Sequence, residues 1–389
     1  MPPVQQWHDR VRIDALFGCG GPGGIFTSMT TTTQTDPTGF FTLEQRAGRW
    51  WLLTPQRQPF FSLGLNHIDP ATMRYPENIE RWRDRYGSST IRWIEESVAP
   101  HLRQWGFNTV GWVQEATVGQ WQHSRSFTPY EYRALGMPYF HLLPFTKSHQ
   151  WEANVRHYDY DSSEWETWCD HVARSQVVDL CDDPNLIGYF YSDCPTWVHD
   201  AKPNKWRGPI FDPDLLASAS GRKELRRLAT RYYETTHDAV RRYDPHHLIL
   251  GDRYEANAAL PMEVIDAALP LVDVLSFQDF VDPVSHLREW YEKTERPVLL
   301  ADAAHLEWHR KPTYARNDGH RYARTLADLR QNPGCIGFHL CGAFQRNRTR
   351  RWGLLDENEQ PDVENVAAIR DANRETLEWV TGTSQQAGT

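Results

Sequence analysis

The residues best suited to chemistry in this chain follow a short apolar run near its middle. The stretch Asn185–Trp197 begins with an apolar segment that has no periodicity, which is typical of a strand buried on both faces. An acid, a thiol and an aromatic ring come at its carboxyl end, as Asp193, Cys194 and Trp197. In parallel α/β proteins that end carries the catalytic and binding groups. The alternative is a strand that runs into a loop, with Asp193 only capping a turn.

Nearly every other predicted strand also ends in polar or charged groups. A structural barrel does not need such a set, because charged groups are seldom buried without a partner. If the strands close into a barrel, the groups converge on one mouth. They are Asn66, His67, Trp112, Gln114, Glu115, Asp193, Cys194, Trp197, Asp252, Arg253, Glu255, Gln278, Asp279, Asp302, His305, Glu307, His339, Gln345 and Trp352.

The elements that would position these groups alternate regularly along the chain. Short buried strands are predicted to start near residues 60, 107, 138, 186, 247, 272, 297 and 335, with helical patterns between them. This alternation predicts an α/β fold, a (β/α)8 TIM barrel in a single domain. A doubly wound open sheet is the alternative, although no GxGxxG or GxxxxGK[ST] motif opens a helix. A short hairpin is expected before the first strand, and Ser88 or Ser89 should cap the first barrel helix.

The barrel is expected to occupy residues 40–380 of the 389-residue chain. Residues 1–39 contain the low-complexity runs FGCGGPGG and TTTTQTD, which predict a disordered extension, with Met29 as an alternative start. Residues 381–389 are expected to form a loose tail.

The amino-acid composition limits the kinds of molecule that the chain is expected to bind. The chain has 42 Lys and Arg against 51 Asp and Glu, a net charge of −9, which argues against nucleic acid and anionic membranes. The six cysteines form no CxxC motif and suit a reducing compartment. No apolar run reaches the roughly 18–20 residues of a membrane span, and no signal-peptide pattern is visible. These features together predict a cytoplasmic protein, with export left open.

Several segments resemble agarase-type glycoside hydrolases, near family 50 of clan A. The similarity covers about residues 41–365. It rests on GRWWLLTPQRQPFFSLGLNHI, LRQWGFNTVGW, DDPNLIGYFYSDCPTW, RPVLLADAAH and RWGLLDENEQP. The resemblance implies a (β/α)8 enzyme that hydrolyses glycosidic bonds with retention and without a cofactor. It also implies an acid/base Glu, preceded by Asn, after the fourth strand, and a nucleophile Glu at the end of the seventh.

The chain departs from that pattern at the catalytic positions. Asp193 stands at the Asn position, Cys194 at the acid/base position and Asp302 at the nucleophile position. Glycoside hydrolysis still needs two carboxyl groups, one protonated and one ionised, and Asp193 and Asp302 could supply them. Because Asp is shorter than Glu, this pair leaves a wider gap. The wider gap favours inversion, or a different acid such as Glu115 or Glu255.

Two further interpretations of these residues remain open. Cys194 is a poor acid for a glycosidic oxygen, but it could be a nucleophile if its pKa were lowered, or simply a small buried side chain. His67, Asp302, His305 and His339 come together in a closed barrel and are metal-ligand types, although no HxH or HExxH spacing supports a metal. Hydrogen bonding to sugar hydroxyls is the simpler role for these histidines, so no metal is predicted.

The loop Arg346–Trp352 holds four arginines, which could bind a carboxylate or sulfate on a sugar. Its alternative is a solvated loop that pairs with Asp356, Glu357 and Glu359. Candidate sugar platforms are Trp112, Trp197, Trp308 and Trp352, although tryptophan more often fills a core. The predicted substrate-binding residues are Asn66, His67, Trp112, Glu115, Trp197, Asp252, Arg253, Glu255, Gln278, His305, His339, Arg348 and Trp352.

The sequence therefore predicts a glycoside hydrolase acting on a galactose-containing or otherwise unusual glycan or small glycoside. Asp302, Asp193 and Cys194 are its predicted catalytic residues. The alternatives are a barrel that binds sugar without cleaving it, and a metal-dependent enzyme built on His67, His305 and His339. Oligomeric state cannot be inferred from these patterns.

Overall fold

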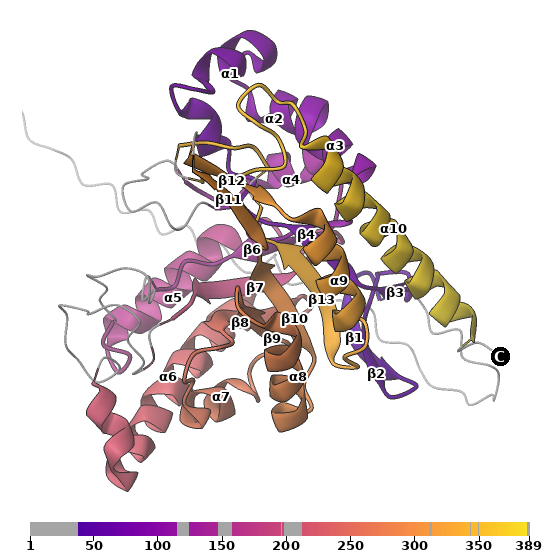
Figure 1. Ribbon diagram of the computed structural model, residues 1–389. Helices are drawn as coiled ribbons and strands as arrows, with labels where there is room; N and C mark the ends of the chain where they lie inside the picture. Colours follow the sequence, from indigo (N-terminus) through magenta and orange to yellow (C-terminus); the bar gives the residue numbers. More distant parts are fainter. Residues whose placement is uncertain are drawn as a thin grey trace, which may run out of the picture. The chain divides into compact units, whose positions relative to one another are not determined.

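Eight of the chain's apolar segments form parallel strands that close into a barrel (Figure 1). The computed structural model describes residues 38–114, 124–146, 158–195, 197, 212–310, 313–342, 344–348 and 350–386. The barrel strands are β4 (Ser62–Leu65), β5 (Thr109–Val110), β6 (Tyr139–Leu142), β7 (Leu186–Asp193), β8 (Leu248–Glu255), β9 (Leu275–Gln278), β10 (Val298–Ala303) and β13 (Cys335–Leu340). Each begins within three residues of its predicted start, and β13 pairs with β4 to close the ring. The predicted (β/α)8 barrel is confirmed.

Helices follow the strands in the order expected of this fold. They are α1 (Ile79–Tyr86), α2 (Thr90–Trp93), α3 (Ala99–Gln104), α4 (Pro129–Leu135), α5 (Ser163–Gln176), α6 (Ala219–Tyr243), α7 (Met262–Ala268), α8 (Pro283–Thr294), α9 (Gly319–Leu329) and α10 (Val363–Gln386). Ser89 caps α2, as predicted, and a π-type turn over Ile94–Val98 joins α2 to α3. Thr128 and Glu131 form a reciprocal capping box that starts α4. Among the described residues, no helix has the length and apolar character that crossing a membrane requires.

The strands are buried on both faces, which explains their lack of hydrophobic alternation. One cluster fills the inside of the barrel and includes Phe140, Ile187, Leu250 and Leu299. A second cluster joins the outward-facing strand residues to the helices; Tyr191, for example, contacts Phe145 with ring centroids 5.1 Å apart. Successive residues of a strand therefore pack alternately inside the barrel and against the helices.

A small antiparallel sheet lies at the amino ends of the strands. It consists of β1 (Thr42–Arg46), β2 (Arg49–Leu53) and β3 (Pro59–Phe60), and it contains the predicted hairpin plus one extra strand. Trp50 donates from its backbone N to Pro333 O at 2.8 Å and from Nε1 to Glu295 O at 3.1 Å. Those carbonyls lie just before β13 and β10, so the sheet is fixed beneath the barrel.

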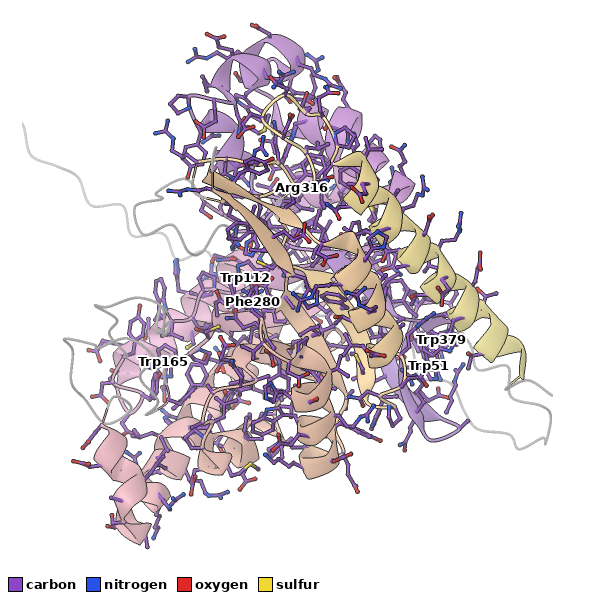
Figure 2. All side chains as sticks on the ribbon, in the orientation of Figure 1. Trp51, Trp112, Trp165, Phe280, Arg316 and Trp379 are labelled. Atoms are coloured by element: carbon purple, nitrogen blue, oxygen red, sulfur yellow. The ribbon has the colours of Figure 1, made fainter. Side chains whose placement is uncertain are left out.

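The last helix returns to this amino-terminal sheet. Trp379 of α10 packs on Trp51 of β2 with ring centroids 5.3 Å apart, and the two rings lie side by side in Figure 2. The Arg49 guanidinium stacks over the Trp379 ring at 4.8 Å. The amino-terminal sheet and the last helix are thus packed together.

An antiparallel hairpin after β10 was not predicted. It comprises β11 (Leu306–Arg310) and β12 (Thr313–Asn317). Arg316 of β12 donates from Nε to Asp362 at 2.6 Å, which ties the hairpin to the start of α10. The sequence does not indicate this hairpin, because it is defined by the pairing of two short segments and not by a buried apolar run.

Candidate active site

A buried arginine lies between two aspartates at the carboxyl end of the barrel. Arg253 donates to Asp193 Oδ1 from Nε at 2.8 Å and from Nη2 at 2.7 Å. The same Nη2 lies 3.5 Å from Asp302 Oδ2. The guanidinium stacks over the Trp112 ring at 4.3 Å, and all four side chains are buried. The two predicted catalytic aspartates are therefore brought together, with a cation between them.

A glycine directs Arg253 into the barrel. Leu248 and Leu250 of β8 point inward, so strict alternation would send residue 252 inward and residue 253 outward. Gly251 has φ of +62°, and the pairing of β7 with β8 shifts register at this point. Such a bulge reverses the alternation, because it inserts one residue between the paired positions. Arg253 consequently enters the mouth, and Asp252 turns outward.

Asp302, at the end of β10, is held in its ionised form. Its Oδ1 accepts a hydrogen bond from Asn66 Nδ2 at 2.6 Å, and Asn66 Oδ1 accepts one from the backbone N of Trp112 at 2.8 Å. Burial alone would raise the pKa of Asp302. The positive charges of Arg253 and Arg350 outweigh burial and keep the pKa of Asp302 well below its usual range. Asp302 can therefore act as an anion at any neutral pH.

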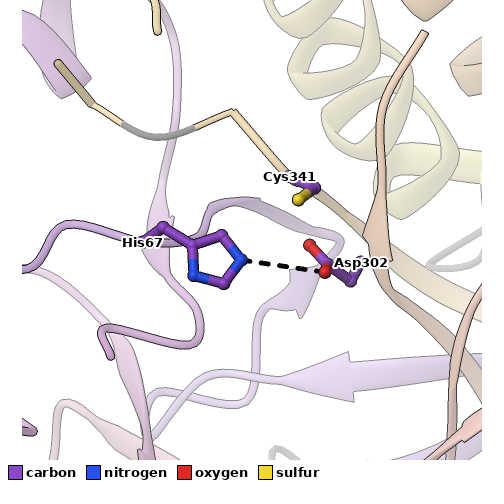
Figure 3. A group of neighbouring side chains, drawn as sticks. All are labelled: His67, Asp302 and Cys341. Atoms are coloured by element: carbon purple, nitrogen blue, oxygen red, sulfur yellow. Dashed lines mark ion pairs between the residues drawn. The ribbon is translucent and has the colours of Figure 1, made fainter. Parts of the chain in front are cut away.

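His67 lies beside Asp302 and Cys341 (Figure 3), and Arg350 contacts His67. His67 Nδ1 donates to Gln114 O at 2.8 Å, which leaves Nε2 to accept from Arg350 Nη2 at 2.8 Å. His67 Nε2 lies 3.7 Å from Asp302 Oδ2. Arg350 also donates from Nη1 to Cys341 Sγ at 3.1 Å. His67 has φ of +58°, a strained conformation of the kind found at functional sites.

The structure does not bring together the three histidines of the metal-dependent alternative. His305 Nε2 is hydrogen-bonded to Thr325 Oγ1 at 2.7 Å, and His339 Nε2 to Ser62 Oγ at 2.8 Å. Burial lowers the pKa of His339 to about 3, so its ring is neutral. Among the described residues, His305 and His339 belong to no group of candidate ligands with His67, so the metal-dependent alternative built on His67, His305 and His339 is corrected.

A different set of candidate ligands does come together among the described residues. Single atoms of His67, Asp302 and Cys341 all lie within 4.8 Å of one another. The Arg350 guanidinium donates to two of them, so it already supplies positive charge at this point. Burial also raises the pKa of Cys341 well above that of a free thiol, which disfavours the thiolate that a metal requires. The donor set fits an arginine better than a metal ion.

Glu255 is an acid at the mouth that is partly exposed. It ends β8, and its Oε2 accepts a hydrogen bond from Gln278 Nε2 at 2.7 Å. Burial raises the pKa of Glu255 to about 7, and the negative charges of Asp279, Asp193 and Asp302 act in the same direction. Glu255 was predicted only as a substrate-binding residue and as a possible substitute acid.

Cys194 lies next to this acid but is a thiol. Its Sγ is 3.6 Å from Asp193 Oδ1 and 3.9 Å from Glu255 Oε2. Burial raises its pKa well above the usual range, with the charges of Asp193 and Glu255 adding to the effect. A nucleophilic thiolate needs the opposite shift. With φ of +43°, Cys194 also adopts a backbone conformation that non-glycine residues seldom take.

Several other predicted residues lie away from this cluster. Asp252 faces α6 and accepts hydrogen bonds from Tyr232 at 2.9 Å and Tyr233 at 2.7 Å. Trp197 packs on the same two tyrosines and is only 2 % exposed. Arg348 pairs with Glu77 at the surface at 3.3 Å, whereas Arg346 of the same loop pairs with Glu357 at 2.7 Å, one of the acids that the solvated-loop interpretation names.

Aromatic rings near the mouth divide into buried and exposed ones. Trp112 is 1 % exposed beneath Arg253, whereas Trp352 is partly exposed and donates from Nε1 to Cys341 O at 3.2 Å. Phe280 follows Gln278 after β9 and is 40 % exposed, but it was not predicted as a site residue (Figure 2). Its only signal in the sequence is its place two residues after a strand end. Glu115 and the side chain of Trp308 lie outside the described residues.

Comparison with known proteins shows where this fold occurs. No family model matches the chain, and no curated protein matches its sequence. An exo-β-agarase structure matches with a TM-score of 0.67 and 15% identity, covering 89% of this chain and 66% of that one. The agarase AgWH50C matches with 0.66 and 16% (87% and 63% covered), and BpGH50 with 0.62 and 15% (91% and 85%). A GH2 β-galacturonidase from Eisenbergiella tayi reaches 0.50 and 12% (86% and 54%).

This chain spans less than two thirds of the length of the exo-β-agarase and of AgWH50C. At these identities the similarity establishes a shared barrel fold. The expected agarase-type fold is thus found.

Proposed function

We propose that this barrel is a glycoside hydrolase that cleaves a glycosidic bond of a galactose-containing or otherwise unusual glycan or small glycoside. The observation that carries the proposal is the environment of Asp302. Three polar side chains, Asn66, Arg253 and His67, surround a buried carboxylate at the end of the seventh barrel strand. A structural barrel has no need of an ion at that place, because burying a charge is unfavourable without a compensating role.

The chemistry that this carboxylate offers suits glycoside hydrolysis. The transition state carries positive charge near the anomeric carbon, and an ionised carboxylate held by fixed donors stabilises it without rearranging. The fold is shared with proteins described as agarases, which supports a carbohydrate substrate.

The test is turnover of a panel of aryl glycosides and agar-derived oligosaccharides by the wild-type chain and by Asp302→Asn. The variant should lose at least about 100-fold in kcat, the low end for removing a catalytic carboxylate. It should stay folded, since the amide keeps the shape. Asp238→Asn, on an exposed position of α6, is the control and should retain wild-type turnover. Wild-type kcat in Asp302→Asn would remove Asp302 from the mechanism.

One observation favours a second function, a barrel that binds sugar without cleaving it. Arg253 forms ion pairs with both predicted catalytic aspartates, so neither of that pair is placed to donate a proton. Calorimetric titration of the same oligosaccharides separates the two functions. Binding without any product over days would support the binding barrel and end the hydrolase proposal.

A further inference from the structure

The further inference concerns the proton donor, and it rests on the proposed hydrolase function. We infer that Glu255 delivers the proton to the glycosidic oxygen, and that Asp193 serves to position Arg253. This assigns the acid to the fifth barrel strand, β8, in place of the fourth strand, β7, where the sequence pattern points.

Asp193 is committed as a hydrogen-bond acceptor. Its Oδ1 receives two N–H groups of Arg253, at 2.8 and 2.7 Å, and lies 3.6 Å from the Cys194 thiol. Protonating this carboxylate would weaken the two shortest contacts of a buried guanidinium, whose other carboxylate partner, Asp302, lies farther away at 3.5 Å. Asp193 is therefore a positioning residue for Arg253, which in turn lies against Asp302.

Glu255 is placed to act on a substrate at the mouth. It is two residues after Arg253 on β8, so both side chains leave the strand on the same face. Glu255 is the outer of the two and is partly exposed, whereas Asp193 and Asp302 are 2 % and 3 % exposed. Gln278 on the neighbouring strand β9 donates to its Oε2 and fixes the carboxyl group.

Its ionisation supports the same role. Burial raises the pKa of Glu255 to about 7, and the nearby carboxylates add to this. The pKa of Glu255 thus lies close to neutral pH, where its protonated form is populated. The pKa of Asp302 is lowered, in the opposite direction. Two carboxyl groups whose pKa values differ in this way can serve as a proton donor, Glu255, and as an anion, Asp302.

The step can be written with all atoms in place. The Glu255 proton passes to the glycosidic oxygen as the bond from that oxygen to the anomeric carbon breaks, and the bonding electron pair stays on the oxygen. The Asp302 carboxylate faces the positive charge that develops on the carbon. A water molecule then bonds to the anomeric carbon and gives one proton back to Glu255. One water is consumed for each bond that is cleaved.

The test compares Glu255→Gln with the wild type on glycosides that differ only in their leaving group. A poor leaving group, such as methanol, needs the proton, so kcat/KM should fall at least about 100-fold. A dinitrophenolate leaves without one, so the loss there should stay below about 10-fold. Asp193→Asn is the matched comparison. As a positioning variant it should lose similar factors on both substrates.

The pH profile gives a second readout that does not depend on a variant folding well. The kcat/KM of the wild type on the poor leaving group should fall above about pH 7, as Glu255 loses its proton. This basic limb should be missing in Glu255→Gln.

Three outcomes would contradict these assignments, and they can be told apart. If the wild type cleaves no glycoside of the panel, the proposed function fails and the inference fails with it. If the wild type is active and Glu255→Gln keeps its rate on the methyl glycoside, or the wild type has no basic limb, only the inference fails. A leaving-group dependence in Asp193→Asn, absent from Glu255→Gln, would return the acid to β7.

Discussion

Gly251 determines which side chains of β8 reach the barrel mouth. Its positive φ creates the bulge that sends Arg253 inward and Asp252 outward, although the two are neighbours in the chain. The inward arginine joins Asp193 to Asp302, and the outward aspartate joins the strand to α6. One backbone conformation thus separates a functional from a structural charge.

Replacing Gly251 should therefore affect both stability and activity. In Gly251→Ala the new Cβ would lie 2.8 Å from Val272 Cγ1, and the backbone would remain at a φ that alanine disfavours. We expect a loss of roughly 1–3 kcal/mol in the free energy of unfolding, measured in urea, together with reduced kcat.

Gly382→Ala is the matched control for this prediction. A Cβ at Gly382 meets nothing within 4 Å, and alanine favours the helical conformation of α10. That variant should be at least as stable as the wild type. A Gly251→Ala chain with unchanged stability and activity would show that the bulge does not need glycine.

At the scale of elements, the strands could be predicted from the sequence and the contacts between them could not. Buried apolar runs such as Val298–Ala301 indicate a strand because they are too short for a helix and follow turn residues. The pairing of Arg253 with Asp193 depends on a register shift between β7 and β8, which no local pattern records. The hairpin β11–β12 was missed for a related reason, since its pairing is defined by contacts and not by hydrophobic periodicity.

Asp252, the outward-facing residue of β8, leads to a prediction about how stability depends on pH. Burial raises the pKa of Asp252 to about 6, against the hydrogen bonds from Tyr233 and Tyr232. The folded chain then binds this proton more tightly than the unfolded chain, whose Asp has a pKa of about 3.9. The contribution of Asp252 to stability is therefore full below about pH 4 and is lost as the pH rises towards 6. The loss amounts to roughly 2–3 kcal/mol.

Asp252→Asn removes this titration, so its free energy of unfolding should change less than that of the wild type between pH 4 and pH 7. Urea unfolding at several pH values measures the difference, and Asp238→Asn, exposed on α6, should follow the wild-type curve. Parallel curves for Asp252→Asn and wild type would mean that Asp252 titrates normally in the folded chain.

At the scale of the whole barrel, stability depends on contacts between the two ends of the described chain. Trp379 packs against Trp51 and Phe61, with ring centroids 5.3 and 5.9 Å apart, and Arg49 stacks on its face. These contacts join α10 to the sheet beneath the barrel, far from the carboxylates of the mouth. Stability and catalysis should therefore be separable here.

Trp379→Ala should lower the free energy of unfolding by about 3 kcal/mol, the lower range for removing a packed tryptophan. It should leave kcat on a glycoside substrate within about twofold at temperatures where the variant is folded. Leu377→Ala, at an exposed position of the same helix, provides the control and should cost much less. A large loss of kcat with intact folding would reveal coupling between α10 and the mouth.

The closure of the ring by β13 also bears on how the chain folds as it is synthesised. β13 pairs with β10 on one side and with β4, the first barrel strand, on the other. Until Cys335–Leu340 has left the ribosome, β4 and β10 each present an unpaired edge, and such edges promote association with other chains. Contacts this distant in sequence also slow folding. The nascent protein must therefore carry open edges through most of its synthesis, and a chaperone that shields them would raise its yield.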